Sequence, residues 1–282
     1  MQIDIIEEYA RKIRGLVIDS VFRAQSGHPG GSLSCADILA VLYGSVLRID
    51  PYKADFTERD RFVLSKGHAA PAYYAALALR GYFSPQLLMR LRRLDGSLQG
   101  HPSMNGTPGV DMSTGSLGQG LSAAVGMALY AKAEQLGYHT FCLTGDGELQ
   151  EGQLWEAAMT APHYRLSNLT LLVDRNGLQI DGETDDVMNL LSIEEKLKSF
   201  GWHVWTADGH SITDIYNAMQ KALKMEDRPS AIVFQTIKGK GVSYMENQAQ
   251  WHGAAPNEQQ HRQALAELGF SESGVECYAV NT

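Results

Sequence analysis

Near the N-terminus, apolar residues recur every three or four positions: Ile6, Ala10, Ile13, Val17, Val21 and Ala24. This spacing places them on one face and predicts an amphipathic helix from about residue 4 to residue 24, with Gly27 as its stop. Farther along, Ser34 and Asp37 have the spacing of a capping box, which predicts a helix that runs to about Leu47.

Strand candidates follow at residues 61–65, 140–144, 169–173, 203–206 and 230–235, and the apolar run at 140–144 is typical of a buried strand. Helical segments are expected between them, including an alanine-rich one that ends at Gly81 and one that starts at Ser84-Pro85. The alternation predicts an α/β fold, a parallel sheet with helices on both faces. We expect a single domain over residues 1–282, with a C-terminal tail from about residue 255.

Composition narrows the class of protein. The chain is 44% hydrophobic and 20% charged, as in an ordinary globular protein. A net charge of −8 without a Lys/Arg cluster disfavours a nucleic-acid or membrane surface. The acidic start does not resemble a signal peptide, and no apolar run reaches membrane-spanning length. Cys35, Cys142 and Cys277 form neither a disulfide framework nor a metal motif, so a reducing cytoplasmic setting is expected.

Polar or glycine-rich loops follow three of the predicted strands: Ser65 to His68, Gly145 to Gly147 and Asp174 to Gly177. In open parallel sheets, ligands bind at this end of the strands. Asp146 lies between two glycines, which allow the backbone to approach a ligand while the carboxylate meets a hard cation. A single Gly-Asp-Gly is more often an ordinary turn. Asp146 together with Asn176, at successive strand ends, predicts a cation site.

The spacing of Asp146 and Asn176 resembles the metal motif shared by thiamine-diphosphate enzymes. By that resemblance, Asp146, the side chain of Asn176 and the backbone carbonyl of Leu178 bind a divalent cation that bridges the two phosphates of the cofactor. Mg²⁺ is the expected ion, with Ca²⁺ or Mn²⁺ as substitutes. The physics agrees, because an acidic chain needs a cation to hold a pyrophosphate.

Four of the nine histidines lie beside glycine in loops: His28, His68, His101 and His252. Any one of them is more often a surface or capping residue, but four in the same setting favour a functional site. The other five stand in predicted strands or helices and are interpreted as structural: His139, His163, His203, His210 and His261. No pair has the spacing of zinc ligands.

These loops resemble the transketolase family, in the family's order and over nearly the whole chain. The matching motifs are Gly27-His28-Pro29-Gly30, Ser65-Lys66-Gly67-His68, Gly100-His101-Pro102, Gly115 to Gly120, Gly145 to Gly152, Asn176 to Gly182, Thr236 to Gly241 and His252-Gly253. The resemblance implies the thiamine-diphosphate-binding fold, here its pyrophosphate domain. It also implies transfer of a two-carbon ketol unit from a ketose phosphate to an aldose or aldose phosphate.

The same resemblance assigns roles to individual residues. His68 and His252 would contact the diphosphate, while His28, His101 and His252 would act on the sugars, since histidine moves protons near neutral pH. The remaining cofactor-binding candidates are Gly115, Leu117, Gly147 and Ile180. For Leu117 and Ile180, ordinary core packing is nearly as good an explanation. Glu151 and Glu156 match family glutamates at a subunit interface, with a solvated helix face as the alternative.

Two departures from the common family pattern, Ser116 in place of proline and Gly30-Gly31-Ser32 in place of an apolar stretch, leave substrate preference open. Full-length transketolases are more than twice as long, and their second domain carries the glutamate that protonates the cofactor's aminopyrimidine. The resemblance therefore implies a split enzyme. Its expected partner is a C-terminal, pyrimidine-binding subunit, in a heterotetramer of two copies of each that acts on sugar phosphates.

Other functions fit the sequence less well. A 2-oxoacid dehydrogenase subunit shares the metal motif but lacks the Gly-His-Pro loops, and a deoxyxylulose-phosphate synthase usually lacks a pair like His28-Pro29. A non-catalytic remnant of the fold is disfavoured by the intact Asp146, Asn176 and four histidines. Dinucleotide binding is disfavoured because the glycines of Gly115 to Gly120 are in the wrong order and follow no clear strand.

Overall fold

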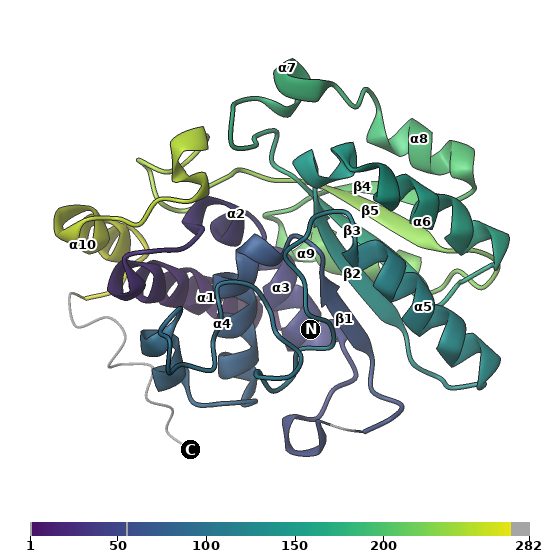
Figure 1. Cartoon of the computed structure of the whole chain (residues 1–282), viewed down its shortest axis with the longest axis horizontal. Coiled ribbons are helices and arrows are strands. Elements are labelled where there is room, and N and C mark those ends of the chain that lie inside the picture. The colour runs from purple at the N-terminus through teal and green to yellow at the C-terminus, as the bar shows by residue number, and fades with distance from the viewer. Residues whose placement is uncertain (1, 55, 272–282) are drawn as a thin grey trace.

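A five-stranded sheet, in which every neighbouring pair of strands is parallel, forms the centre of the molecule (Figure 1). The computed structural model describes residues 2–54 and 56–271. In spatial order the strands are β1 (Arg61–Leu64), β2 (Thr140–Gly145), β3 (Leu169–Arg175), β5 (Ser230–Gln235) and β4 (His203–Asp208). The predicted α/β class and all five predicted strands are confirmed.

Helices cover both faces of this sheet (Figure 1). The longer ones are α1 (Ile3–Ala24), α4 (Ala70–Arg80), α5 (Gly120–Ala133), α6 (Gly152–His163), α8 (Ile193–Phe200), α9 (Ile212–Ala222) and α10 (Glu258–Glu267). Shorter ones are α2 (Pro29–Ser34), α3 (Ala36–Val41), α7 (Thr184–Met188), η1 (Leu42–Val46), η2 (Pro51–Lys53), η3 (Gly67–Ala69), η4 (Pro85–Arg90), η5 (Gly147–Gln150) and η6 (Ala249–His252).

Alternate residues of the buried strands pack into two cores. Phe62 and Leu64 of β1 join the core formed with α1, α3, α4 and α9, whereas Val63 joins the core formed with α5, α6 and α8. Successive side chains of a strand point to opposite faces, so a strand with helices on both sides must be apolar throughout. This explains why these segments read as continuous apolar runs.

The register brings the carboxyl ends of three strands to one edge. Gly145 at the end of β2 pairs with Asp174 of β3, and Asp174 pairs with Phe234 of β5. The loops after these strands therefore start side by side, although they are far apart in the sequence. This is the edge where the predicted ligand loops meet.

The helix expected from Ser34 to about Leu47 is wrong in its boundaries. Helix α2 already starts at Pro29 and ends at Ser34, α3 follows, and a π-helical turn completes the segment. Ser34 caps no helix. Its hydroxyl instead donates to the Asp174 carboxylate, and this distant partner outweighs the local capping signal. Gly30 permits the tight packing of α2, because a Cβ there would lie 2.8 Å from the Trp251 carbonyl oxygen.

Two further boundaries differ from the predictions. Helix α1 ends at Ala24 with Gln25 in the left-handed conformation (φ 50°), before Gly27. The expected helix at Ser84-Pro85 is a short 3-10 segment, η4.

The segment from residue 255 contains α10, which is held by a capping box between Asn257 and Gln260. His261 on this helix contacts the Asp19 carboxylate of α1 at 3.0 Å. Residues 272–282, including Cys277, lie outside the described residues. None of the described helices has both the length and the apolar character needed to cross a bilayer.

Candidate active site

A cavity of about 100 Å³ lies at the carboxyl end of β2 and β3. The predicted ligand loops line it, through His68, Leu117, Asp146, Gly147, Asn176, Leu178, Ile180 and His252. The structure thus brings together residues from five separate motifs. Three predicted site residues, His28, His101 and Gly115, are absent from this lining and lie next to it.

Asp146 is 3% exposed, and both its carboxylate oxygens accept backbone hydrogen bonds, from Gly147 N–H at 2.9 Å and Gly177 N–H at 2.6 Å. Burial, followed by the nearby charge of Asp174, raises the pKa of Asp146 to about 6. The ionised carboxylate therefore lacks sufficient compensating positive charge. A bound cation would supply that charge.

The neighbouring ligand candidates present oxygen atoms of the kind that Mg²⁺ prefers. The side-chain oxygen of Asn176 accepts from Leu178 N–H at 3.1 Å, and the Leu178 carbonyl accepts from Lys238 Nζ at 3.2 Å. Within residues 2–54 and 56–271, no group of three or more His, Cys, Asp or Glu side chains is arranged to bind a metal ion. One carboxylate, one amide and one carbonyl thus fit a cation that takes its other ligands from a bound pyrophosphate or water.

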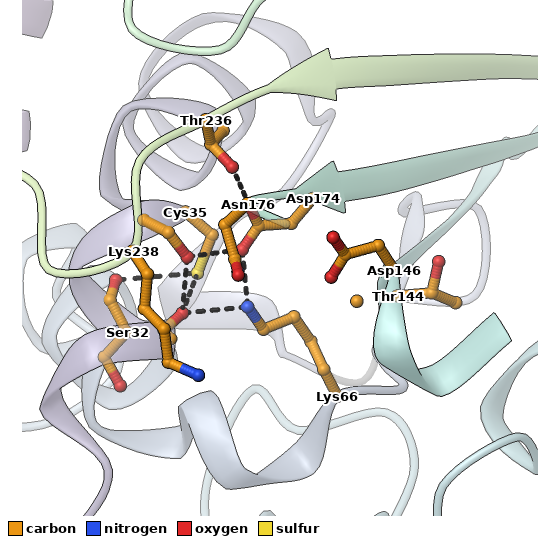
Figure 2. A network of polar contacts seen from close by, with 12 residues as sticks. Ser32, Cys35, Lys66, Thr144, Asp146, Asp174, Asn176, Thr236 and Lys238 are labelled. Carbon is orange, nitrogen blue, oxygen red and sulfur yellow. Dashed lines mark hydrogen bonds and ion pairs between the residues drawn. The ribbon is translucent and has the colours of Figure 1, made fainter. Parts of the chain in front are cut away.

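A buried ionic network lies beside Asp146 (Figure 2). Lys66 Nζ donates to the Asp174 carboxylate at 2.5 Å and to the Gly31 carbonyl at 2.9 Å. The hydroxyls of Ser34 and Thr236 also donate to Asp174. Burial alone would raise the pKa of Asp174, but the Lys66 charge and these hydrogen bonds outweigh it and hold the pKa below its ordinary value.

The network joins α2 and the loops after β1 and β5 to the end of β3, so it fixes the relative positions of four site-forming segments. Lys66 and Asp174 belong to two of the predicted ligand loops, but the sequence patterns assigned neither residue a role. The sequence did contain an indication of such a role, because a charged residue next to a buried apolar strand needs a buried partner.

Glu148 is a second buried carboxylate, and the sequence patterns did not reveal its role. It accepts from the Ser65 hydroxyl, from Gly118 N–H at 3.0 Å and from Gly145 N–H at 3.1 Å. Burial raises its pKa, although these hydrogen bonds oppose the rise. Glu148 thereby ties the ends of β1 and β2 to the 115–120 loop. The only indication of this role in the sequence was the position of Glu148 directly after Gly145-Asp146-Gly147.

Replacing Glu148 with alanine is expected to cost at least about 1–3 kcal/mol of unfolding free energy, because three buried donors lose their acceptor at about 1–3 kcal/mol each and this loss exceeds the relief of the buried charge. Urea unfolding monitored by circular dichroism measures this cost. Glu134→Ala, at the exposed C-cap of α5, is the matched control and should remain near wild type. An equal stability of the two variants would contradict the anchoring role of Glu148.

The four glycine-framed histidines, which the sequence favours as a functional group, lie close together. Ring centroids lie 5.0 Å apart for His68 and His252, 5.5 Å for His28 and His252, 5.6 Å for His28 and His68, and 6.0 Å for His28 and His101. The five histidines interpreted as structural lie elsewhere. His210, for example, contacts Asp37 at 2.7 Å and accepts from Ile237 N–H.

All four rings are held neutral near pH 7. Burial lowers the pKa of His28 to about 4 and that of His252 to about 3, and neighbouring positive charges add to the effect. Burial also lowers the pKa of His68 and, together with Arg92, that of His101. A neutral imidazole offers one donor and one acceptor, so this cluster can exchange protons with oxygen atoms placed between the rings.

Lys238 is a further site residue to which the sequence patterns assigned no role. Its Nζ donates to the Leu178 carbonyl and lies 3.1 Å from His252 Nδ1. Burial, with the charge of Lys66, lowers the pKa of Lys238 to about 8. Lys238 therefore brings positive charge to the rim of a cavity where an anion would bind.

Glycines 67 and 115 are required by close packing. A Cβ on Gly67 would lie 2.8 Å from the backbone nitrogen of Gly115, and one on Gly115 (φ 143°) would lie 3.0 Å from the His101 ring. Gly115 therefore supports His101. Ile180 is 67% exposed at the cavity, which rules out core packing for this residue. Glu151 and Glu156 are both exposed, which fits either an interface or a solvated face.

Comparison with known proteins gives one family. Residues 5–279 match the family model described as transketolase, thiamine diphosphate binding domain. The 6-deoxy-6-sulfo-D-fructose transketolase subunit SqwG of Clostridium sp. (strain MSTE9) is 46% identical, over 95% of this chain and 97% of its own length. One of the subunits of the apulose-4-phosphate transketolase of Phocaeicola vulgatus is 41% identical, over 95% of each chain.

Solved structures agree with these sequence matches. The transketolase of Campylobacter jejuni superposes with a TM-score of 0.90 and 35% identity, covering 96% of this chain but 44% of that one. The similarity thus spans one part of the long transketolases and nearly the full length of the relatives named as subunits.

Proposed function

This chain belongs to the transketolase family as its thiamine-diphosphate-binding part, and we propose that it is the pyrophosphate-binding subunit of a split transketolase. It catalyses ketol transfer together with a second subunit. The observation that carries the proposal is the convergence of four histidine loops at a cavity that also contains Asp146, Asn176 and the Leu178 carbonyl.

Asp146, Asn176 and the Leu178 carbonyl hold a divalent cation, Mg²⁺ by preference and Ca²⁺ or Mn²⁺ in its place. The raised pKa of Asp146 supports this, because a buried carboxylate gains from a cation. His68 and His252 bind the diphosphate oxygens. Gly147, Leu117 and Ile180 line the cofactor site, and Gly115 keeps His101 in place.

Thiamine diphosphate, when bound, supplies the nucleophilic carbon that cleaves the carbon–carbon bond of the donor. The contribution of this chain is to orient the sugars and move their protons. His101 acts at the sugar carbonyl and hydroxyl oxygens as a neutral imidazole that can give and take a proton, whereas His28 and His252, whose Nδ1 atoms face Arg92 and Lys238, act there through Nε2. The lowered pKa values keep all three rings neutral near pH 7.

The substrates are a ketose donor and an aldose acceptor with an anionic end, as in sugar phosphates. Two relatives support this class, because their names specify a sulfonated fructose and a phosphorylated sugar. Lys238 provides positive charge at the cavity, which suits such anions.

The partner is a C-terminal subunit that binds the pyrimidine ring, in an assembly of two copies of each chain. Beside the metal loop, four apolar side chains are exposed: Ile180, Val187, Met188 and Leu191. Such residues suit a surface that another subunit covers. A cytoplasmic location also remains our proposal, consistent with Cys35 and Cys142 as free, buried thiols.

The test is reconstitution. The tagged chain should co-purify with a second subunit, and the mixture should transfer ketol units when given thiamine diphosphate and Mg²⁺. The chain alone should bind the cofactor weakly and turn over no substrate. Removal of divalent ions with EDTA should abolish both binding and transfer, and added Mg²⁺ should restore them. Ketol transfer by the purified chain without a second subunit would overturn the split-enzyme proposal.

A further inference from the structure

Arg92 lies between the loops that carry His28 and His101. Its backbone is in the left-handed region (φ 58°), and its N–H donates to the Leu98 carbonyl at 2.9 Å. Non-glycine residues seldom adopt this backbone conformation, and they keep it only where contacts with the surrounding structure stabilise it. For Arg92, the guanidinium group makes such contacts.

Neighbouring residues contact the guanidinium group on three sides. One terminal nitrogen donates to the Ser26 hydroxyl at 3.0 Å, and the other lies 3.2 Å from Nδ1 of His28. Gly100 packs against it so closely that a Cβ there would lie 3.0 Å from Arg92 Cζ. The buried Nε has no hydrogen-bond partner among the described residues. The group thus bridges two catalytic loops.

Only one protonation state of the neutral His28 ring is compatible with this contact. Arginine remains protonated in proteins and has only hydrogen-bond donors, so Nδ1 of His28 must be the acceptor. A neutral ring that accepts at Nδ1 carries its proton at Nε2. Nε2 lies on the side of Gly253, where the lack of a side chain leaves space, since a Cβ there would be 3.6 Å away.

We propose that Arg92 is a positioning residue that fixes His28 as the Nε2–H tautomer, so that the ring presents a hydrogen-bond donor to a substrate oxygen. The tautomer assignment stands on the geometry of the free chain. The use of the donor for a sugar oxygen rests on the proposed function.

The electrostatic surroundings of His28 keep the ring neutral, so its tautomer decides which nitrogen can donate a hydrogen bond. The charged or titratable groups around the ring are Arg92, His101, Lys238, His68 and His252. Burial, then Arg92, His101 and Lys238, lowers the pKa of His28 to about 4. The ring is therefore neutral at pH 7 and carries one proton, whose position decides which nitrogen donates.

The test is nitrogen-15 NMR of the purified chain with labelled histidine, with the His28 signals assigned by their loss in His28→Gln. Wild type should show Nε2 protonated and Nδ1 unprotonated. Arg92→Met should give a mixture of tautomers and a raised pKa of His28, because a positive neighbour is lost. Arg92→Lys should restore part of the preference, and Arg93→Met, which changes an exposed neighbour, should match wild type.

Gly100→Ala keeps the arginine but pushes the guanidinium aside by a few tenths of an ångström, so it should change the tautomer ratio in the same direction as Arg92→Met and by less. The signals of the remote His139 report whether each variant is folded. A proton at Nδ1 of His28 in wild type, or an unchanged tautomer ratio in folded Arg92→Met, would overturn the proposal.

Activity separates this inference from the proposed function. In the reconstituted enzyme, Arg92→Met should lower kcat by roughly ten- to a hundredfold through misplacement of His28, with little change in cofactor affinity. If ketol transfer is never observed, the NMR result still decides the tautomer. If the tautomer is correct but kcat is unchanged, the use of His28 as a donor to the substrate is wrong.

Discussion

Asp146→Asn is expected to abolish tight binding of thiamine diphosphate with Mg²⁺ and to lower ketol transfer by more than about a hundredfold, beyond the 10–100-fold typical of residues that only support metal ligands. Asparagine keeps the shape but removes the charge that attracts the cation. Isothermal titration calorimetry with the cofactor and Mg²⁺ measures the binding loss. The exposed Asp214→Asn on α9 is the matched control and should bind as wild type.

The same variant should change the stability of the cofactor-free chain little, because two effects oppose each other. Since burial raises the pKa of Asp146 to about 6, the ionised carboxylate costs roughly 3 kcal/mol of folding free energy above pH 6, and asparagine removes this cost. Asparagine also leaves the Gly147 or Gly177 N–H without its acceptor, at about 1–3 kcal/mol. Tight cofactor binding by folded Asp146→Asn would disprove the assigned cation site.

Lys66→Met is expected to destabilise the chain by about 3–5 kcal/mol, the largest stability effect among our predictions. The change leaves the Asp174 carboxylate fully buried without its cation, while the hydroxyls of Ser34 and Thr236 remain as donors. Urea unfolding at pH 7.5 measures the loss. Lys198→Met, which breaks an exposed ion pair with Glu195, is the control and should cost less than about 1 kcal/mol.

The pH dependence provides an independent check on this pair. In wild type the pKa of Asp174 is held below its ordinary value, so its stabilising contribution is present above an unfolded pKa near 3.8 and is lost in stronger acid. In Lys66→Met, burial is no longer offset and the pKa of Asp174 should rise. Protonation then relieves the buried charge, so the stability gap between variant and wild type should narrow as the pH falls from 7.5 to 5.

A double variant tests the cause of the destabilisation. Lys66→Met combined with Asp174→Asn has no unpaired charge and should recover more than half of the loss, since the introduced amide oxygen can still accept from Ser34 and Thr236. If Lys66→Met alone lies within about 1 kcal/mol of wild type, or if its gap widens in acid, the ion pair does not anchor the loops as inferred.

The strands and most helices could be predicted from the sequence because their signals are local. A run such as residues 140–144 is apolar at nearly every position, which a strand covered on both faces requires. The position of Asp146 and Asn176 directly after two such strands then placed them at one edge of a parallel sheet. The roles of the histidines came from the resemblance to a family, and the structure adds that their rings meet.

The partners of buried polar groups could not be predicted in this way. Lys66 and Asp174 are 108 positions apart, and Arg92 reaches His28 across 64 positions. No local pattern encodes such pairs, because they depend on how loops pack after the sheet has formed. The same reason explains the wrong helix boundary at Ser34, whose hydroxyl binds Asp174 instead of a helix end.

The sequence by itself therefore determined the α/β class, the order of the loops that meet at the cavity and the candidate oxygen and imidazole ligands. Tertiary structure alone decided which buried charges compensate each other, why the four histidines are neutral and which nitrogen of His28 lies against Arg92. The physical reason is that a hydrophobic period is set by neighbours along the chain, whereas desolvation and hydrogen bonding are set by neighbours in space.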